Sequence, residues 1–142
     1  MHHGSLADRT DTKIAVPPQS FGAGAITGAT IDTLGWDGAC FEISIGAITG
    51  AGVMDAYVKR DAASAFTTST NVTNAALTQV TNANPNTTHV IDVYRPSARY
   101  LKLIMTQATN TVVAGATVTL YRRSGLLPPT SSAIQVVKVA EN

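Results

Sequence analysis

The sequence predicts an all-β protein whose strands form an antiparallel β-sandwich. Only 13% of the residues are charged, about half of the usual share, whereas threonine, alanine, glycine and asparagine are abundant. Runs of alternating apolar and polar residues recur between turns rich in glycine, proline and asparagine. Three β-rich runs between Thr88 and Arg123 also follow one another too closely for a helix to lie between them. These three observations favour strands throughout the chain.

The length of the chain fits a single domain with two arms. A chain of 142 residues buries roughly two thirds of the surface that it exposes when unfolded, which is enough for a core without disulfides. We expect an N-terminal arm over residues 1–20, a β-sandwich domain over residues 21–123 and a C-terminal arm over residues 124–142.

The N-terminal arm is polar up to Lys13 and then contains a short β-like piece, Ile14 to Val16. Pro17 and Pro18 lack backbone N–H donors, so this piece is confined to a sheet edge or an extended connection. We expect Phe21 to anchor the arm to the domain.

The first strands of the domain are expected between residues 29 and 59. Residues 29–34 form one strand, and residues 40–48 and 53–59 form two more, joined as a hairpin by the glycine-bearing loop 49–52. In the first arm of the hairpin, Phe41, Ile43 and Ile45 share one side, which predicts a half-buried strand. Trp36 lies in the preceding turn, where a lid on the core is favoured over a ligand-stacking platform.

The rest of the chain alternates between a loop, a sheet and an arm. We expect residues 61–85 to form a long surface loop with one short element near residues 75–80. Residues 88–123 then supply three neighbouring antiparallel strands. After Pro128 and Pro129, residues 133–139 form an apolar strand that either adds to the sheet edge of a neighbouring subunit or folds back on its own domain.

The composition offers little chemistry for catalysis. On a strand, His89 shares a face with Ile91 and Val93, as a packed histidine does, and Cys40 is expected to be a buried, inert thiol. Glu42 and Asp55 fall on neighbouring predicted strands, where two outward acids are normally solvated. We therefore expect no enzyme activity, no cofactor and no metal.

The charge and hydropathy of the chain argue against two classes of partner. A formal net charge of +1 creates no field that would attract nucleic acid. No stretch reaches the roughly twenty apolar residues of a membrane helix, and the N-terminus has no apolar signal-peptide core. We expect neither nucleic acid nor a membrane as a partner.

Four strand-forming runs, residues 41–50, 53–58, 98–105 and 117–122, carry a resemblance to a known group. In pattern, the chain resembles the small cement or decoration proteins of tailed bacteriophage capsids, particularly those with jelly-roll domains. The resemblance implies a jelly-roll sandwich and a non-enzymatic protein that binds the outside of the major capsid protein shell and stabilises it. It also implies synthesis in the host cytoplasm and a final place on the outer surface of the virion.

The rival hypothesis belongs to another class. The run from Arg99 to Leu103 is similar to a strand of discoidin-like carbohydrate-binding sandwiches, in which loops at one end hold sugars. A phage tail or baseplate component is a third possibility and shares the structural class.

The arms are the expected places of interaction. We predict a homo-oligomer, a dimer or trimer formed by exchange of arms or edge strands, and contacts with subunits or the capsid through apolar arm residues. These residues are Ile14, Val16, Phe21, Leu126, Leu127, Ile134, Val136, Val137 and Val139.

Overall fold

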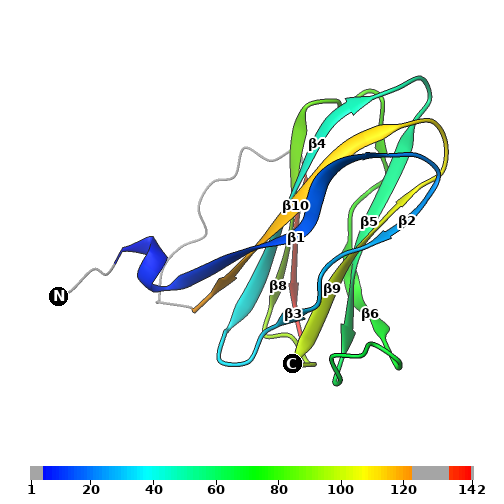
Figure 1. Ribbon diagram of the computed structural model, residues 1–142. Helices are drawn as coiled ribbons and strands as arrows, with labels where there is room; N and C mark the ends of the chain where they lie inside the picture. Colours follow the sequence, from blue (N-terminus) through cyan, green and yellow to red (C-terminus); the bar gives the residue numbers. More distant parts are fainter. Residues whose placement is uncertain (1–4, 123–134, 142) are drawn as a thin grey trace.

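The computed structural model describes residues 5–122 and 135–141 as two β-sheets packed face to face (Figure 1). The predicted all-β sandwich of mainly antiparallel strands is confirmed, with β11 (Gln135–Ala140) parallel to β8 (Thr87–Tyr94) as the exception, while its jelly-roll form stays a prediction. In the five-stranded sheet the order is β1 (Thr10–Phe21), β10 (Val112–Tyr121), β4 (Gly38–Ile48), β8 and β11. The six-stranded sheet contains β2 (Gly24–Thr27), β9 (Tyr100–Gln107), β5 (Val53–Asp61) and β6 (Thr70–Ala76), with β3 (Ile31–Asp32) beside β9 and β7 (Val80–Thr81) beside β5.

The core lies between the sheets and follows the alternation in the sequence. Successive side chains of a strand point to opposite faces, so every second residue of β4, β5 and β9 enters the core. The inward residues are at most 3% exposed, and they are Phe41, Ile43, Ile45, Met54, Ala56, Val58, Leu101, Leu103 and Met105.

The predicted hairpin between residues 40 and 59 is wrong. Strand β4 belongs to the five-stranded sheet and β5 to the other, so loop 49–52 crosses from one sheet to the other. Both strands bury one face and keep the other polar, and that pattern is the same for a hairpin and for a crossing. Glu42 and Asp55 consequently lie on different sheets and not side by side.

The prediction that residues 88–123 form three neighbouring strands is also wrong. The strands exist, but β8 and β10 lie on either side of β4 in one sheet, while β9 pairs with β5 in the other. Close spacing in the sequence indicated adjacency, whereas each connection here passes between the two sheets.

Residues 61–85 contain more strand than the predicted long loop. Strands β6 and β7 lie along β5, residues 77–79 and 82–86 are short connections, and the segment 62–69 is a longer loop at one end of the sandwich. Asp61 holds this loop, since its carboxylate accepts hydrogen bonds from the backbone N–H of Ala63 at 3.0 Å and of Thr68 at 2.9 Å.

The N-terminal segment joins the sheet earlier than expected. Residues 10–20, assigned to the arm from the sequence, belong to β1, which pairs with β10 along its whole length. A short 3-10 turn, η1 (Leu6–Asp8), precedes it and projects from the sandwich with the start of β1 (Figure 1). Gly28 passes so close to both sheets that a Cβ there would lie 2.8 Å from the carbonyl oxygens of Ala15 and Leu103.

Candidate functional site

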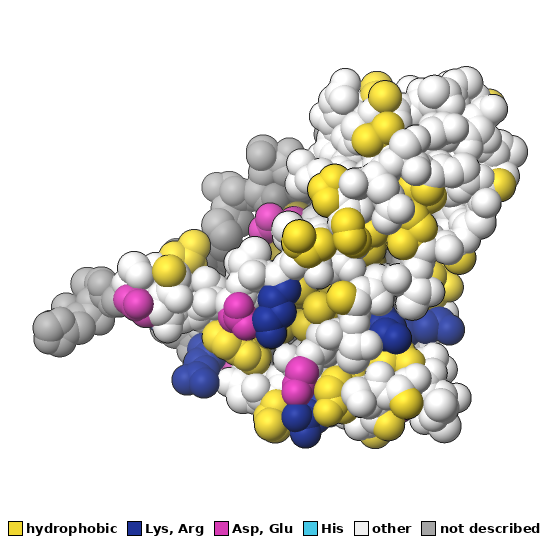
Figure 2. Space-filling view, in the orientation of Figure 1, with side chains coloured by type: hydrophobic (Ala, Val, Ile, Leu, Met, Phe, Trp, Pro, Cys, Tyr) yellow, Lys and Arg dark blue, Asp and Glu magenta, His cyan; other side chains and the backbone are white. Residues whose placement is uncertain are grey.

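Within the described part of the chain, one end of the sandwich carries no charged side chain. Four loops meet there, 22–23, 49–52, 82–86 and 108–111, and we call them the charge-free end. The chain has no Asp, Glu, Lys or Arg over residues 14–31, 43–54, 62–91 and 103–121, which include all four loops. Figure 2 shows the upper part of the visible face without a charged group, whereas cations and anions gather below.

Hydrogen bonds between the loops fix the shape of this end. Thr49 and Thr111 are linked three times, because the N–H and the hydroxyl of Thr49 both donate to the Thr111 carbonyl and the Thr111 N–H donates to the Thr49 hydroxyl. The Asn82 amide donates to the Gly50 carbonyl at 2.5 Å, and the Thr109 hydroxyl donates to the Ala51 carbonyl at 2.9 Å. The loops therefore present a preorganised surface of hydroxyl, amide and methyl groups.

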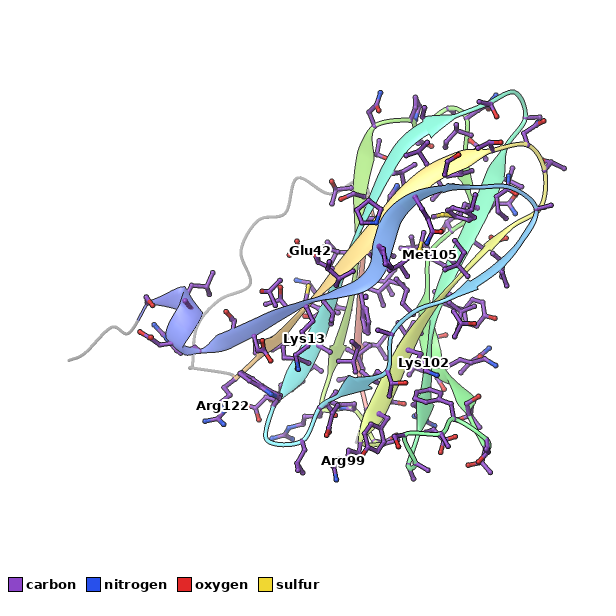
Figure 3. The ribbon with its side chains drawn as sticks, in the orientation of Figure 1. Lys13, Glu42, Arg99, Lys102, Met105 and Arg122 are labelled. Carbon is purple, nitrogen blue, oxygen red and sulfur yellow. The ribbon has the colours of Figure 1, made fainter. Side chains whose placement is uncertain are left out.

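The opposite end holds most of the arginines and an open hollow. The hollow, of about 390 Å³, is lined by the turn 33–37 and the loop 95–99. Arg99 binds Asp32 with two hydrogen bonds, at 2.9 and 2.7 Å, and these bonds lower the pKa of Asp32 to about 2. Arg99, Lys102 and Arg122 all lie toward this end (Figure 3).

Trp36 lines the hollow but is not a free platform. Its side chain packs against the core, as predicted for a lid, and the Arg122 guanidinium lies over its ring at 5.3 Å. The Arg122 Nε also donates to the Gly35 carbonyl at 3.1 Å, which holds the cation in place. A sugar would have to displace Arg122 before it could stack on this face of the indole.

A second contact closes the sandwich at the edge formed by β11. The buried Glu141 carboxylate forms an ion pair with Arg60 of the other sheet and accepts a hydrogen bond from the Ser97 N–H at 3.1 Å. Val137 and Val139 pack against the core from the same strand. In this chain, β11 therefore folds back on its own domain, one of the two alternatives left open by the sequence.

Burial shifts the pKa values of His89 and Cys40, the histidine and the thiol considered from the sequence. His89 is fully buried and contacts the Thr87 hydroxyl through Nε2 at 2.9 Å, and burial lowers its pKa. Burial raises the pKa of the Cys40 thiol to about 12, so the nucleophilic thiolate is scarce at neutral pH. Among residues 5–122 and 135–141, no three His, Cys, Asp or Glu side chains form a cluster that could hold a metal ion.

The structure scatters the residues that were predicted to make contacts. Ile14 is 58% exposed, whereas Val16 is fully buried and Phe21 is half-buried against the core. The backbone of Val136 pairs in β11 beside Val90, and Leu126, Leu127 and Ile134 lie outside the described residues. Among the described residues, Val16, Phe21, Val137 and Val139 pack against the core, so these arm residues do not form one exposed patch.

Reasoning from the sequence missed the charge-free end and the Arg60–Glu141 pair. The signal for the first was present, because four segments of the sequence contain no Asp, Glu, Lys or Arg. The pair gave no signal, since its partners are far apart in sequence and each resembles an ordinary surface residue.

No family model matches the chain, and a search of curated proteins finds no match either. Within the described residues, no helix has the length and apolar character needed to cross a membrane.

Proposed function

We propose that this chain is a virion structural protein that binds the outside of a capsid shell and stabilises it. The observation that best supports the proposal is the charge-free end, where four loops meet and hydrogen bonds join three of them, 49–52, 82–86 and 108–111. Docking such a surface removes no ion from water, and little loop entropy is lost because the loops are already ordered.

The repeated geometry of a shell strengthens this kind of contact. A protein that links several sites of a lattice gains from effective concentration, so modest contacts give a high total affinity. The sandwich core and the loop hydrogen bonds provide a stiff body that can bridge neighbouring major capsid protein subunits.

Binding to emptied shells tests the proposal. Shells of the phage that encodes this chain, prepared without it, are mixed with the pure protein, sedimented and heated. We expect saturable co-sedimentation and a higher rupture temperature of the shells. Absence of both effects would refute the proposal, and co-sedimentation with tails instead of shells would assign the protein to the tail or baseplate.

Matched substitutions locate the contact. Ala83→Glu places a charge at an exposed position of the charge-free end, and Ala65→Glu places the same charge on the exposed loop at the other end. We expect Ala83→Glu to weaken shell binding at least about tenfold, because burying an unpaired carboxylate is costly, and Ala65→Glu to have little effect. Equal affinities of the two variants would show that the charge-free end makes no contact with the shell.

Carbohydrate binding is the second candidate, because Trp36, Arg95 and Arg99 line the hollow at the opposite end. A glycan array with the wild type and Trp36→Ala tests it. Saturable sugar binding that Trp36→Ala abolishes would favour this candidate. The position of Arg122 over the indole makes it the weaker of the two.

A further inference from the structure

Strand β1 is an open edge of the five-stranded sheet. Among the described strands it pairs on one side only, with β10. An open edge offers unpaired backbone N–H and C=O groups to another strand unless the protein blocks it.

Blocking features are present in β1, but only in its second half. The pairing with β10 shifts register between Ile14 and Val16 and again between Val16 and Gln19, and Pro17 and Pro18 follow the first shift. The Ala15 carbonyl is already used by the Ala29 N–H at 2.8 Å. By contrast, residues 10–14 pair with β10 in continuous register and contain neither proline nor irregularity.

Residues 10–14, the regular half of β1, carry charges that would face opposite charges in an antiparallel copy of the same strand. Asp11 and Lys13 lie on the same face of the strand, and their side chains are 44% and 47% exposed. If Thr12 of one copy lies opposite Thr12 of another, Asp11 of each copy lies opposite Lys13 of the other. This register makes two cross-strand pairs of opposite charge on one face.

Apolar groups that flank the regular half remain exposed. Leu6 is 76% exposed and Ile14 is 58% exposed. The turn that carries Leu6 is fixed, since the Ser5 N–H and hydroxyl bond the Asp8 carboxylate at 2.8 and 3.0 Å and the Thr10 hydroxyl donates to the Leu6 carbonyl at 2.9 Å. In the register centred on Thr12, the turn of each copy approaches the second half of β1 in the other.

We propose that two copies of this chain associate through the outer edges of their β1 strands, antiparallel and centred on Thr12. The two five-stranded sheets then form one continuous sheet across a twofold axis, and each Leu6 covers apolar surface near Pro17 of the other copy. The contact is isologous, so it closes after two copies and uses the β1 edge of both, while β11 stays the outer strand at each end of the joined sheet. This inference concerns the free protein and does not depend on binding to a capsid.

A charge-exchange experiment tests the register. Asp11→Lys gives a strand with two cations, and Lys13→Glu gives a strand with two anions. We expect the wild type to be a dimer by sedimentation equilibrium and each reversal to raise the dissociation constant about tenfold, because like charges now face each other twice. Mixed in equal amounts, the two variants should form a heterodimer, detected by native mass spectrometry, as tight as the wild-type dimer.

The controls separate this contact from a general effect of charge. Within one copy, Lys13 forms an ion pair with Asp11 at 3.0 Å. Neither reversed chain retains this pair, so recovery in the mixture can arise only between chains. Lys59→Glu, on another strand, should leave the mass of the dimer unchanged. Leu6→Ser should weaken the dimer more than Leu34→Ser, whose leucine is 67% exposed at the hollow end. A monomeric wild type, or an oligomer that is insensitive to both reversals, would overturn the proposal.

Discussion

Acid should destabilise this protein through His89. The imidazole is fully buried and its burial lowers its pKa, so the folded state resists protonation. Its Nδ1 atom has no hydrogen-bond partner among the described residues, although the charged ring would require partners for both nitrogens. The experiment therefore lowers the pH and compares the free energy of unfolding of the wild type with that of His89→Leu.

The sign follows from proton binding in the two states. The unfolded chain takes up a proton at His89 near its ordinary pKa of 6.5, whereas the folded chain does so only at lower pH. The contribution of neutral His89 to the free energy of unfolding is therefore fully present above the unfolded pKa. It is lost as the pH falls below that pKa, by about 1.4 kcal/mol per pH unit, until the folded pKa is reached. Burial raises the pKa of Asp92, so protonation of Asp92 at low pH favours the folded state. Asp92 is present in both proteins, so its effect cancels in the difference between the wild type and His89→Leu.

Urea unfolding followed by circular dichroism between about pH 7 and about pH 5 measures this difference. His2 and His3 are present in both chains, so the difference isolates His89. Ile91→Val is the control, because it should cost about 1 kcal/mol at every pH while keeping the acid dependence. Equal slopes for the wild type and His89→Leu would refute the reasoning.

Two further substitutions test how the sheets are joined. Gly28→Ala should lower the free energy of unfolding by about 2–3 kcal/mol, because its Cβ meets backbone oxygens of both sheets. The control Gly22→Ala, whose Cβ has its nearest atom at 3.9 Å, should change the free energy of unfolding by less than about 0.5 kcal/mol. Equal thermal midpoints of the two variants would contradict the close approach at Gly28. Arg60→Ala should lower the free energy of unfolding in urea by about 2–3 kcal/mol, because it leaves the buried Glu141 carboxylate without its ion pair. The control Lys59→Ala, on the same strand, should cost little. If Arg60→Ala left the free energy of unfolding unchanged, the ion pair would not hold β11 in place.

Much of the core could be predicted from the sequence. The alternation of Phe41, Ile43 and Ile45 with Glu42 and Ser44 identifies an inward and an outward face, and the structure places them as expected. Period-two alternation is a local property of a strand, so it can be seen without knowledge of the partner strands.

The assignment of strands to sheets could not be predicted in this way. Loop 49–52 is short and rich in glycine, which suits a hairpin, yet it crosses between the sheets because Thr49 pairs with Thr111 of the β9–β10 connection. Contacts of this kind join residues far apart in the chain, as does the pair between Arg60 and Glu141. Alternation, loop length and turn chemistry carry no information about them.

Two of the predicted contact residues belong to the core for a related reason. Apolar character marked Val16 and Val139 as candidates for an interface, but their own sheet edges need apolar residues to complete the core. What distinguishes a surface in this protein is the absence of charge over long segments, which becomes meaningful once the fold brings four loops to one end.

A map of the decorated shell by electron cryo-microscopy tests the central proposal most directly. Shells saturated with the protein should show the sandwich standing on the capsid surface, with loops 22–23, 49–52, 82–86 and 108–111 against the major capsid protein and the arginine-rich end toward solvent. A shell without added density, or a sandwich that contacts the shell through the arginine-rich end, would contradict the account.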